Sequence, residues 1–287
     1  MSLEVRAADK IRDLPEMQAI ASQALASGDA RCTIHPGDLA WWVHHEDPRV
    51  ADSTTYWLMG DSGFSVLEEG KDINALTIPG GDLVGLIEWS RQRLDDKAEV
   101  GSVSEADTEL VSYLQASGFE PSSYMLNFEM DLAEGEVPTP DLGPGWELRH
   151  VRDEEEANNR REASHRAFAS KMDPQAHLNR YLRFMRSPVY DNERDLVAVA
   201  PDGRIAAFMV WWSDPSGIAL IEPFGTHSDF HRQGVGTALL KFGLARMKAA
   251  GMRTVRVCTD ESREAAVAFY ASVGFGQGPR LGSWRPR

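Results

Sequence analysis

The sequence is poor in cysteine: Cys32 and Cys258 are its two cysteines, and they lie far apart in a chain of 287 residues. Two distant cysteines exclude a disulfide framework and a Cys-x-x-Cys metal site. No apolar run approaches the roughly 18 residues needed to span a bilayer. The N-terminal residues also lack the charged-then-apolar pattern of a signal peptide. We therefore expect a cytoplasmic protein without a membrane partner.

Basic residues are fewer than acidic ones, with 30 Lys and Arg against 44 Asp and Glu, which gives a net charge of −14. Nucleic-acid binding needs a basic face, so this balance argues against a nucleic-acid partner. The imbalance lies in the first half. Residues 1–142 contain 9 basic and 27 acidic residues, a balance of −18, whereas residues 143–287 contain 21 and 17, a balance of +4. A polyanionic ligand should prefer the second half.

A proline-rich stretch separates the two halves. It reads LAEGEVPTPDLGPGW from Leu132 to Trp146, with three prolines and two acids before the first of them. Such a composition is typical of a semi-rigid linker. Because a chain of this length has room for two domains, we predict domains at 1–133 and 146–287, joined by a linker at 134–145.

The second half alternates between strand and helix patterns. The Asp202-Gly203 pair between two apolar runs predicts a hairpin. Gly251 is well placed to end a long helix. We predict strands that start near residues 146, 195, 204, 218 and 254. We predict helices over 153–170, 174–186 and 262–272, and a long helix that follows the loop SDFHRQG and ends at Ala250. This order predicts an α/β fold with a sheet of mixed direction.

The first half repeats the end of the second. Gly118-Phe119 and Gly274-Phe275 each follow a helical pattern, and the two Phe residues are 156 positions apart. The segments YWLMGDSGFSVLEE, NALTIPGG and DLVGLIEWSRQRL match the preceding strands and long helix in order. We therefore predict two copies of one fold.

One segment of the second half has the features of an anion site. It reads His231-Arg232-Gln233-Gly234-Val235-Gly236-Thr237 and lies between an apolar strand and an amphipathic helix. The glycines allow a tight turn and close approach of a ligand. The free amides of the helix N-terminus attract an anion such as a pyrophosphate. An ordinary strand-to-helix turn with incidental glycines is the alternative. The sequence has no Gly-x-Gly-x-x-Gly or Gly-Lys-Ser/Thr loop.

The run from Ile218 to Phe275 resembles the GNAT family of acyl-CoA-dependent N-acyltransferases. The family signature Gln/Arg-x-x-Gly-x-Gly/Ala matches as His231-x-x-Gly234-x-Gly236, with His at the first position. A second departure is Arg263, where the family often has Asn. The resemblance implies that residues 231–237 bind the pyrophosphate of acetyl-CoA. It also implies that Phe224, Gly225 and Thr226 pair with the pantetheine arm, and that no metal takes part.

The resemblance also implies direct attack by an amine, which requires a proton donor for the thiolate and a base for the amine. Tyr270 matches the usual general acid, and a core tyrosine is the alternative interpretation. Glu222 is the candidate base, although the family typically places a Glu two residues earlier, at Leu220. Glu222 shares a face with Leu220 if the strand alternates regularly. Glu222 could instead form a salt bridge. His227 and Asp229 are the other candidates for the base.

The first half reads as a degenerate copy of this fold. Leu114 lies opposite Tyr270, and the loop Ile78–Gly85 lacks the Gly-x-Gly spacing and contains an acid but no base. We expect it not to bind CoA. The fold class predicted for the chain is thus α/β, with two tandem GNAT-like domains, each a mixed, mostly antiparallel sheet flanked by helices.

The function predicted from the sequence is transfer of an acetyl group from acetyl-CoA to a primary amine of a small molecule. An acyl-CoA-binding sensor without turnover and an acetyltransferase for protein N-termini or lysines are the alternatives. The acidic first half favours cationic acceptors. We expect a monomer or weak homodimer.

Overall fold

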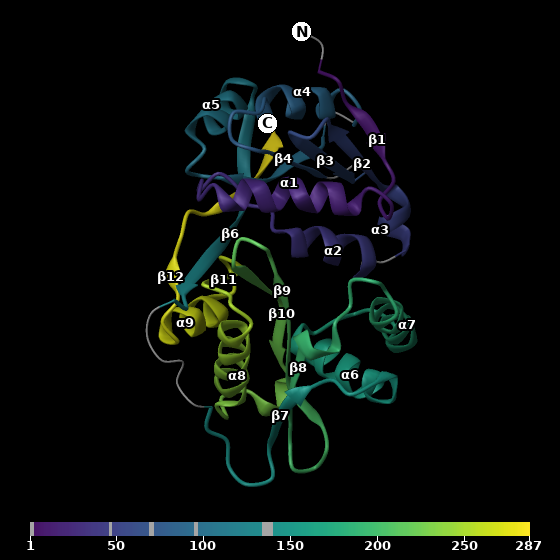
Figure 1. The fold of residues 1–287 in the computed structure, drawn as a ribbon, viewed down its shortest axis with the longest axis vertical. Helices are drawn as coiled ribbons and strands as arrows, with labels where there is room; N and C mark the ends of the chain where they lie inside the picture. Colours follow the sequence, from purple (N-terminus) through teal and green to yellow (C-terminus); the bar gives the residue numbers. More distant parts are fainter. Residues whose placement is uncertain (1–2, 46–47, 69–71, 95–96, 134–139) are drawn as a thin grey trace. The chain divides into compact units, whose positions relative to one another are not determined.

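The computed structural model describes residues 3–45, 48–68, 72–94, 97–133 and 140–287. Residues 134–139 of the predicted linker lie outside this set. The chain folds into two compact units (Figure 1). The first contains residues 1–129, 214–216 and 258–287, and the second contains residues 130–213 and 217–257. The units therefore differ from two uninterrupted halves, because the last 30 residues (258–287) pack with the first unit.

The first unit is built on a sheet with the strand order β1-β2-β3-β4-β5-β13-β6. Neighbours in this sheet are antiparallel except β4 and β5, which are parallel. The C-terminal strand β13 lies between β5 and β6, and this pairing places the end of the chain in this unit. The strands are β1 Arg6–Ala8, β2 Thr54–Met59, β3 Gly63–Glu68, β4 Asp72–Thr77, β5 Glu99–Ser104, β6 Phe119–Asp131, β12 Gly276–Gln277 and β13 Leu281–Pro286.

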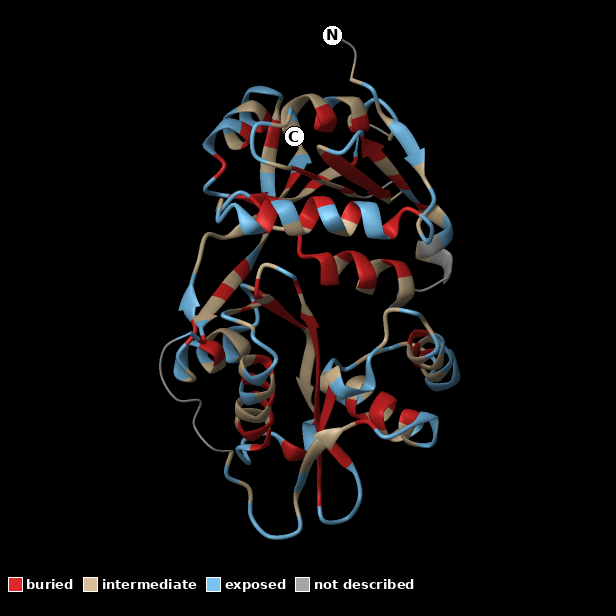
Figure 2. Cartoon of the chain, viewed as in Figure 1, coloured by how far each residue is buried: buried red, intermediate tan, exposed pale blue. Residues whose placement is uncertain are grey.

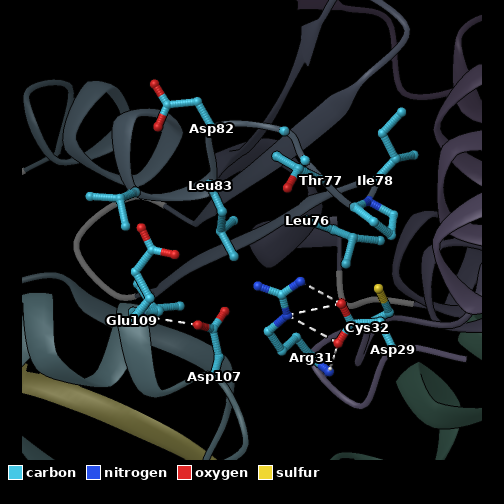
Figure 3. A pocket seen from close by; sticks show the side chains of 15 residues that line it. Asp29, Arg31, Cys32, Leu76, Thr77, Ile78, Asp82, Leu83, Asp107 and Glu109 are labelled. Carbon is cyan, nitrogen blue, oxygen red and sulfur yellow. Dashed lines mark hydrogen bonds and ion pairs between the residues drawn. The ribbon is translucent and has the colours of Figure 1, made fainter. Parts of the chain in front are cut away.

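Helices flank this sheet and close its core. They are α1 Leu14–Ala26, α2 Pro36–His45, α3 Pro48–Ser53, α4 Leu83–Arg91, α5 Thr108–Ala116 and α9 Glu264–Ser272. One buried cluster joins Ile87 of α4 and Leu114 of α5 to Ile73 of β4 and Trp284 of β13. The loop between β4 and α4 borders a pocket (Figure 3).

The second unit has the strand order β11-β10-β9-β8-β7, with β10 and β11 parallel and the other pairs antiparallel. Its strands are β7 Glu147–His150, β8 Asp195–Val199, β9 Ile205–Ser213, β10 Ile218–Thr226 and β11 Thr254–Asp260. All of β8 is buried, as is all of β9 except its last residue (Figure 2). These strands form the centre of the unit.

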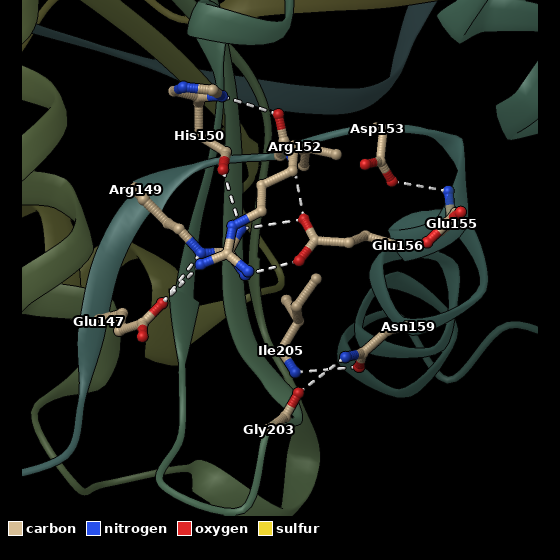
Figure 4. A network of polar contacts seen from close by, with 11 residues as sticks. Glu147, Arg149, His150, Arg152, Asp153, Glu155, Glu156, Asn159, Gly203 and Ile205 are labelled. Carbon is tan, nitrogen blue, oxygen red and sulfur yellow. Dashed lines mark hydrogen bonds and ion pairs between the residues drawn. The ribbon is translucent and has the colours of Figure 1, made fainter.

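Helices cover both faces of the second sheet. They are α6 Ala157–Ala167, α7 Pro174–Met185 and α8 Val235–Ala249, with short 3₁₀ turns η1 Glu154–Glu156, η2 Asn192–Arg194 and η3 Ser228–Phe230. Phe208 of β9 packs with Ala163 of α6, and the adjacent Met209 faces Gly243 of α8. Asn159 of α6 accepts a hydrogen bond from the Ile205 amide (3.0 Å) and donates one to the Gly203 carbonyl (2.9 Å), which ties the helix to the β8–β9 hairpin (Figure 4).

These elements confirm the predicted α/β class and the predicted order of strands and helices. The repeat is visible in the crossovers: α4 connects parallel strands β4 and β5, and α8 connects parallel strands β10 and β11. The helices α5 and α9 are each followed by a left-handed glycine, Gly118 (φ 83°) and Gly274 (φ 97°).

Candidate functional site

Strand β10 departs from regular pairing where it reaches the candidate site. Ile221 pairs with Trp211 of β9 and Phe224 pairs with Met209, so Glu222 and Pro223 together lie opposite one residue. The peptide bond between Glu222 and Pro223 is cis. The carbonyl of Glu222 accepts a hydrogen bond from the Trp212 indole (2.9 Å). This bulge interrupts the alternation on which a shared face of Leu220 and Glu222 depends.

Beyond the bulge, Phe224, Gly225 and Thr226 form a half-buried end of the strand. A Cβ at Gly225 would lie 2.8 Å from Phe208 Cζ and 2.9 Å from Ala167 Cβ, so the site has no room for a side chain there. The β10 backbone therefore packs directly against β9 and α6 at this point.

The loop after β10 is held by its own side chains. His227 Nδ1 accepts a hydrogen bond from the Asp229 amide (3.1 Å) and so caps the turn η3. Asp229 forms ion pairs with Arg204 (3.0 Å) and Arg166 (3.3 Å). Burial lowers the pKa of His227. Burial alone would raise the pKa of Asp229. Its hydrogen bonds to the two arginines lower the pKa by more, so that the net shift is downward. His227 and Asp229, the two alternative bases, therefore both stabilise this loop.

Four residues shape the turn into α8. His231 Nε2 donates to the Thr226 carbonyl (2.9 Å), which ties the loop back to β10. Arg232 has a left-handed backbone (φ 62°), and so does Gly234 (φ 77°), the N-cap of α8. Because a non-glycine residue rarely adopts this conformation, Arg232 marks a locally strained turn. Gln233 donates from its side chain to the Asp229 carbonyl (3.1 Å).

The first turn of α8 has no side-chain cap. The first amides of a helix have no partner within the helix, and together with the helix dipole they attract an anion. Val235 is buried and anchors the turn, whereas Thr237 is half-buried. A Cβ at Gly236 would lie 2.8 Å from Thr226 Oγ1, so the glycine lets the helix start close to the end of β10. The predicted cofactor residues 224–226 and 231–237 thus come together in the second unit.

Tyr270 lies on α9 in the first unit. Its side chain is almost buried, and its ring packs against Phe128 (5.5 Å between centroids) and Phe275 (5.7 Å). Burial raises the pKa of the phenol above its usual value of 10. The phenol is therefore protonated at neutral pH and is a weaker acid than an exposed tyrosine.

The loop of the first unit that corresponds to residues 231–237 has a different start to its helix. The Asp82 carboxylate caps α4 by accepting a hydrogen bond from the Gly85 amide (2.8 Å). A carboxylate at this position occupies a donor that a phosphate would otherwise use. This contact agrees with the expectation that the first copy does not bind CoA.

Sequence reasoning missed a buried polar network next to the site. Arg160 of α6 and Asp195 of β8 form an ion pair of 2.9 Å, and both are almost completely buried. Tyr181 of α7 donates to the same carboxylate (2.6 Å), and burial raises the pKa of its phenol. The Arg160 guanidinium lies 3.9 Å from the ring centroid of Phe208. The acid that starts the apolar segment DLVAVA was the sequence signal for this network.

Two further observations concern metal sites and membrane spans. In the parts of the chain that the structure describes, no cluster of three or more His, Cys, Asp or Glu side chains is arranged to hold a metal ion. No helix among the same residues is both long and apolar enough to cross a membrane.

Comparison with known proteins gives the same fold and a chemical class. Residues 154–275 match the model of the Acetyltransferase (GNAT) family. A mycothiol acetyltransferase of Nocardiopsis dassonvillei is 32% identical over 124 residues, which are 39% of this chain and 37% of that protein. One from Salinispora arenicola is 31% identical over 147 residues, 48% of this chain and 47% of that protein. The match thus spans less than half the length of these relatives.

Solved structures resemble the whole chain. A GCN5-related N-acetyltransferase from Sphaerobacter thermophilus has a TM-score of 0.64 at 20% identity and covers 98% of this chain and 94% of its own. A tandem GNAT protein from the clavulanic acid biosynthesis pathway has a TM-score of 0.67 at 17% identity, and the match covers 98% of this chain and 97% of that protein. At these identities the likeness shows the fold, which is a tandem arrangement.

Proposed function

This chain is a tandem member of the GNAT superfamily, and from that premise we propose that it transfers an acetyl group from acetyl-CoA to a primary amine of a small molecule. The observation that carries the proposal is the start of α8, which is uncapped and is entered through two left-handed residues, Arg232 and Gly234. A helix start of this kind binds a pyrophosphate through backbone amides.

In the proposed complex, the amides of residues 231–237 hold the pyrophosphate, and exposed Arg232 adds a positive charge. The pantetheine arm pairs with the backbone of Phe224, Gly225 and Thr226 beyond the bulge. The bulge supports this placement because it separates the end of β10 from regular strand alternation.

In the proposed reaction the amine nitrogen attacks the thioester carbonyl carbon. The C–N bond forms and the C–S bond breaks, so that the amine loses one proton and the CoA thiolate gains one. Tyr270 supplies the proton to sulfur in this scheme, because a phenol carries its proton at neutral pH. Glu222 accepts the proton of the amine, directly or through a water molecule.

A small-molecule acceptor is supported by the two relatives named mycothiol acetyltransferase. Their match covers less than half of either protein, so we do not assign their acceptor to this chain. The acidic first half supports cationic acceptors such as polyamines, aminoglycosides and amino sugars over acidic amino acids. A cytoplasmic enzyme that acts as a monomer or weak homodimer fits this proposal.

The test is release of CoA thiol from acetyl-CoA in the presence of a panel of amines at low and high salt. We expect turnover with at least one cationic primary amine, with a kcat/KM that falls as salt rises. Binding of acetyl-CoA without turnover on any amine would favour the sensor alternative. Turnover on peptide N-termini or lysines alone would favour a protein acetyltransferase.

A further inference from the structure

A tryptophan side chain of the neighbouring strand holds the bulge of β10. Glu222 and Pro223 lie together opposite Val210 of β9, so the ladder between the two strands is interrupted there. Pro223 has no amide hydrogen to donate. The Trp212 indole nitrogen donates a hydrogen bond to the Glu222 carbonyl (2.9 Å). A side chain of β9 therefore anchors the bulge at the point where regular backbone pairing stops.

The Trp212 ring is itself fixed by its packing. It has 7% of its surface exposed, and its centroid lies 6.0 Å from that of Phe184 on α7. Phe184 is buried and packs in turn against Tyr190, with 5.2 Å between the ring centroids. Because closely packed rings resist displacement, the indole sets the position of the Glu222 carbonyl.

The adjacent Trp211 is buried to the same degree, but its indole makes no hydrogen bond. It has 4% of its surface exposed and points to the opposite face of the sheet, as neighbours in a strand do. The Arg194 guanidinium lies 4.9 Å from its ring centroid. The Trp211 indole nitrogen is buried without a hydrogen-bond partner among the residues that the structure describes. Trp211 is therefore a matched control for Trp212.

The end of β10 beyond the bulge is held separately. Residues 224–226, which are proposed to pair with the pantetheine arm, return to regular pairing with residues 207–209 of β9. Gly225 also packs against Ala167 of α6. Loss of the indole hydrogen bond should therefore disturb Glu222 and leave the backbone of residues 224–226 in place.

We propose that Trp212 is a positioning residue for the acetyl transfer. By holding the Glu222 carbonyl it fixes the bulge, and with it the direction in which the Glu222 carboxylate leaves the strand. This inference rests on the proposed role of Glu222 as the base for the amine. A base must lie within hydrogen-bond reach of the proton that it removes, and a displacement of about 1 Å costs about 100-fold in rate. The indole acts through Glu222 and takes no proton itself.

The test replaces Trp212 in the full chain by benzothienylalanine, in which sulfur takes the place of the indole N–H at nearly constant shape. The same replacement at Trp211 is the control. At position 212 we expect kcat to fall by about 10-fold, the scale of one lost hydrogen bond that places a reacting group, with the Kd of acetyl-CoA within a factor of about two. The control should change neither quantity. Equal kcat for the two replacements, or a Kd that rises as much as kcat falls, would overturn the proposal.

Backbone NMR signals report on the bulge without turnover. The replacement at position 212 should move the carbonyl carbon signal of Glu222 and leave the amide signals of Gly225 and Thr226 unchanged. A Glu222 signal that does not move would overturn the proposal. If the native chain acetylated no amine, the proposed acetyl transfer would fail, and the Glu222 signal would still decide whether Trp212 holds the bulge.

Discussion

The loops before α4 and α8 are two versions of one structural element, and they differ in what occupies the helix start. Each connects a strand to a helix that crosses to a parallel strand, β4 to β5 or β10 to β11. The α4 start is capped by the Asp82 carboxylate, and the α8 start has no side-chain cap. The comparison teaches that one acid closes a helix start to an anion, because a carboxylate uses the same amide donors and the same dipole as a phosphate.

A second difference concerns the helices that end in Gly-Phe. Leu114 of α5 and Tyr270 of α9 lie opposite each other in the repeat, and both are buried. Leucine at this place only packs, whereas the tyrosine packs and also carries a phenol. One copy of the fold thus has a phenol where the other has an aliphatic side chain.

The variant with the largest expected effect on the difference between the two helix starts is Gly236→Glu. It gives the α8 start an acid of its own, and its side chain would collide with Thr226 Oγ1, 2.8 Å from the position of its Cβ. We expect acetyl-CoA affinity to fall by about 100-fold or more, since like charges placed together cost several kcal/mol. Ala245→Glu, an exposed position on the same helix, is the control for the added charge and should bind normally in calorimetry.

Tyr270→Phe tests the second difference. If the phenol protonates the thiolate, kcat should fall by about 100-fold, and acetyl-CoA affinity should stay within a factor of about two. Tyr113→Phe is the control, because Tyr113 lies on α5 and accepts a hydrogen bond from Arg91 (3.2 Å). Equal kcat for the Tyr270 variant and the native protein would leave this residue with a packing role.

A weaker effect concerns the response of the second unit to acid. In the second unit, burial and the nearby Arg180 and His165 lower the pKa of His177 to about 4. This histidine is neutral when folded but binds a proton below about pH 6.5 when unfolded. The stability that this histidine contributes is therefore fully present above about pH 6.5 and is lost progressively as the pH falls from 6.5 to about 4.

His177→Leu should remove this part of the acid sensitivity. Between pH 6.5 and 4.5 the native chain should lose about 2 kcal/mol more unfolding free energy than the variant. Urea unfolding at a series of pH values measures the difference, with His150→Leu as the control in the same unit. Parallel pH profiles for the native chain and the His177 variant would contradict the assignment.

The smallest expected effect is that of Asp82→Ala, which removes the side-chain cap of α4 in the first unit. Loss of this helix cap should cost about 1 kcal/mol of unfolding free energy. We expect no acetyl-CoA binding to appear, because Asp107 and Glu109 still line the pocket. Calorimetry checks both points, and a new acetyl-CoA site in the variant would mean that the cap alone excludes the cofactor.

Much of the fold was predictable because its signals are local. Gly274 and Gly118 end their helices, Asp202-Gly203 turns the hairpin, and the spacing of Gly234 and Gly236 marks the start of α8. Each of these is a backbone requirement that a glycine satisfies within a few residues.

What the sequence did not predict depends on contacts distant along the chain. The bulge at Glu222-Pro223 is visible only in the register of β10 with β9, and the Trp212 indole that contacts it comes from the neighbouring strand. The pairing of β13 with β5 and β6 places the end of the chain in the first unit, and no local pattern encodes that choice of partner. The acid at position 82 was noted in the sequence, but its capping of Gly85 was not.

The most direct test of the account is the number of acetyl-CoA molecules that bind one chain. Titration calorimetry should give one site per chain in the native protein and in Asp82→Ala, and none in Gly236→Glu. Two sites per chain in the native protein, or one site that survives Gly236→Glu, would contradict the claim that the uncapped start of α8 is the cofactor site and the capped start of α4 is not.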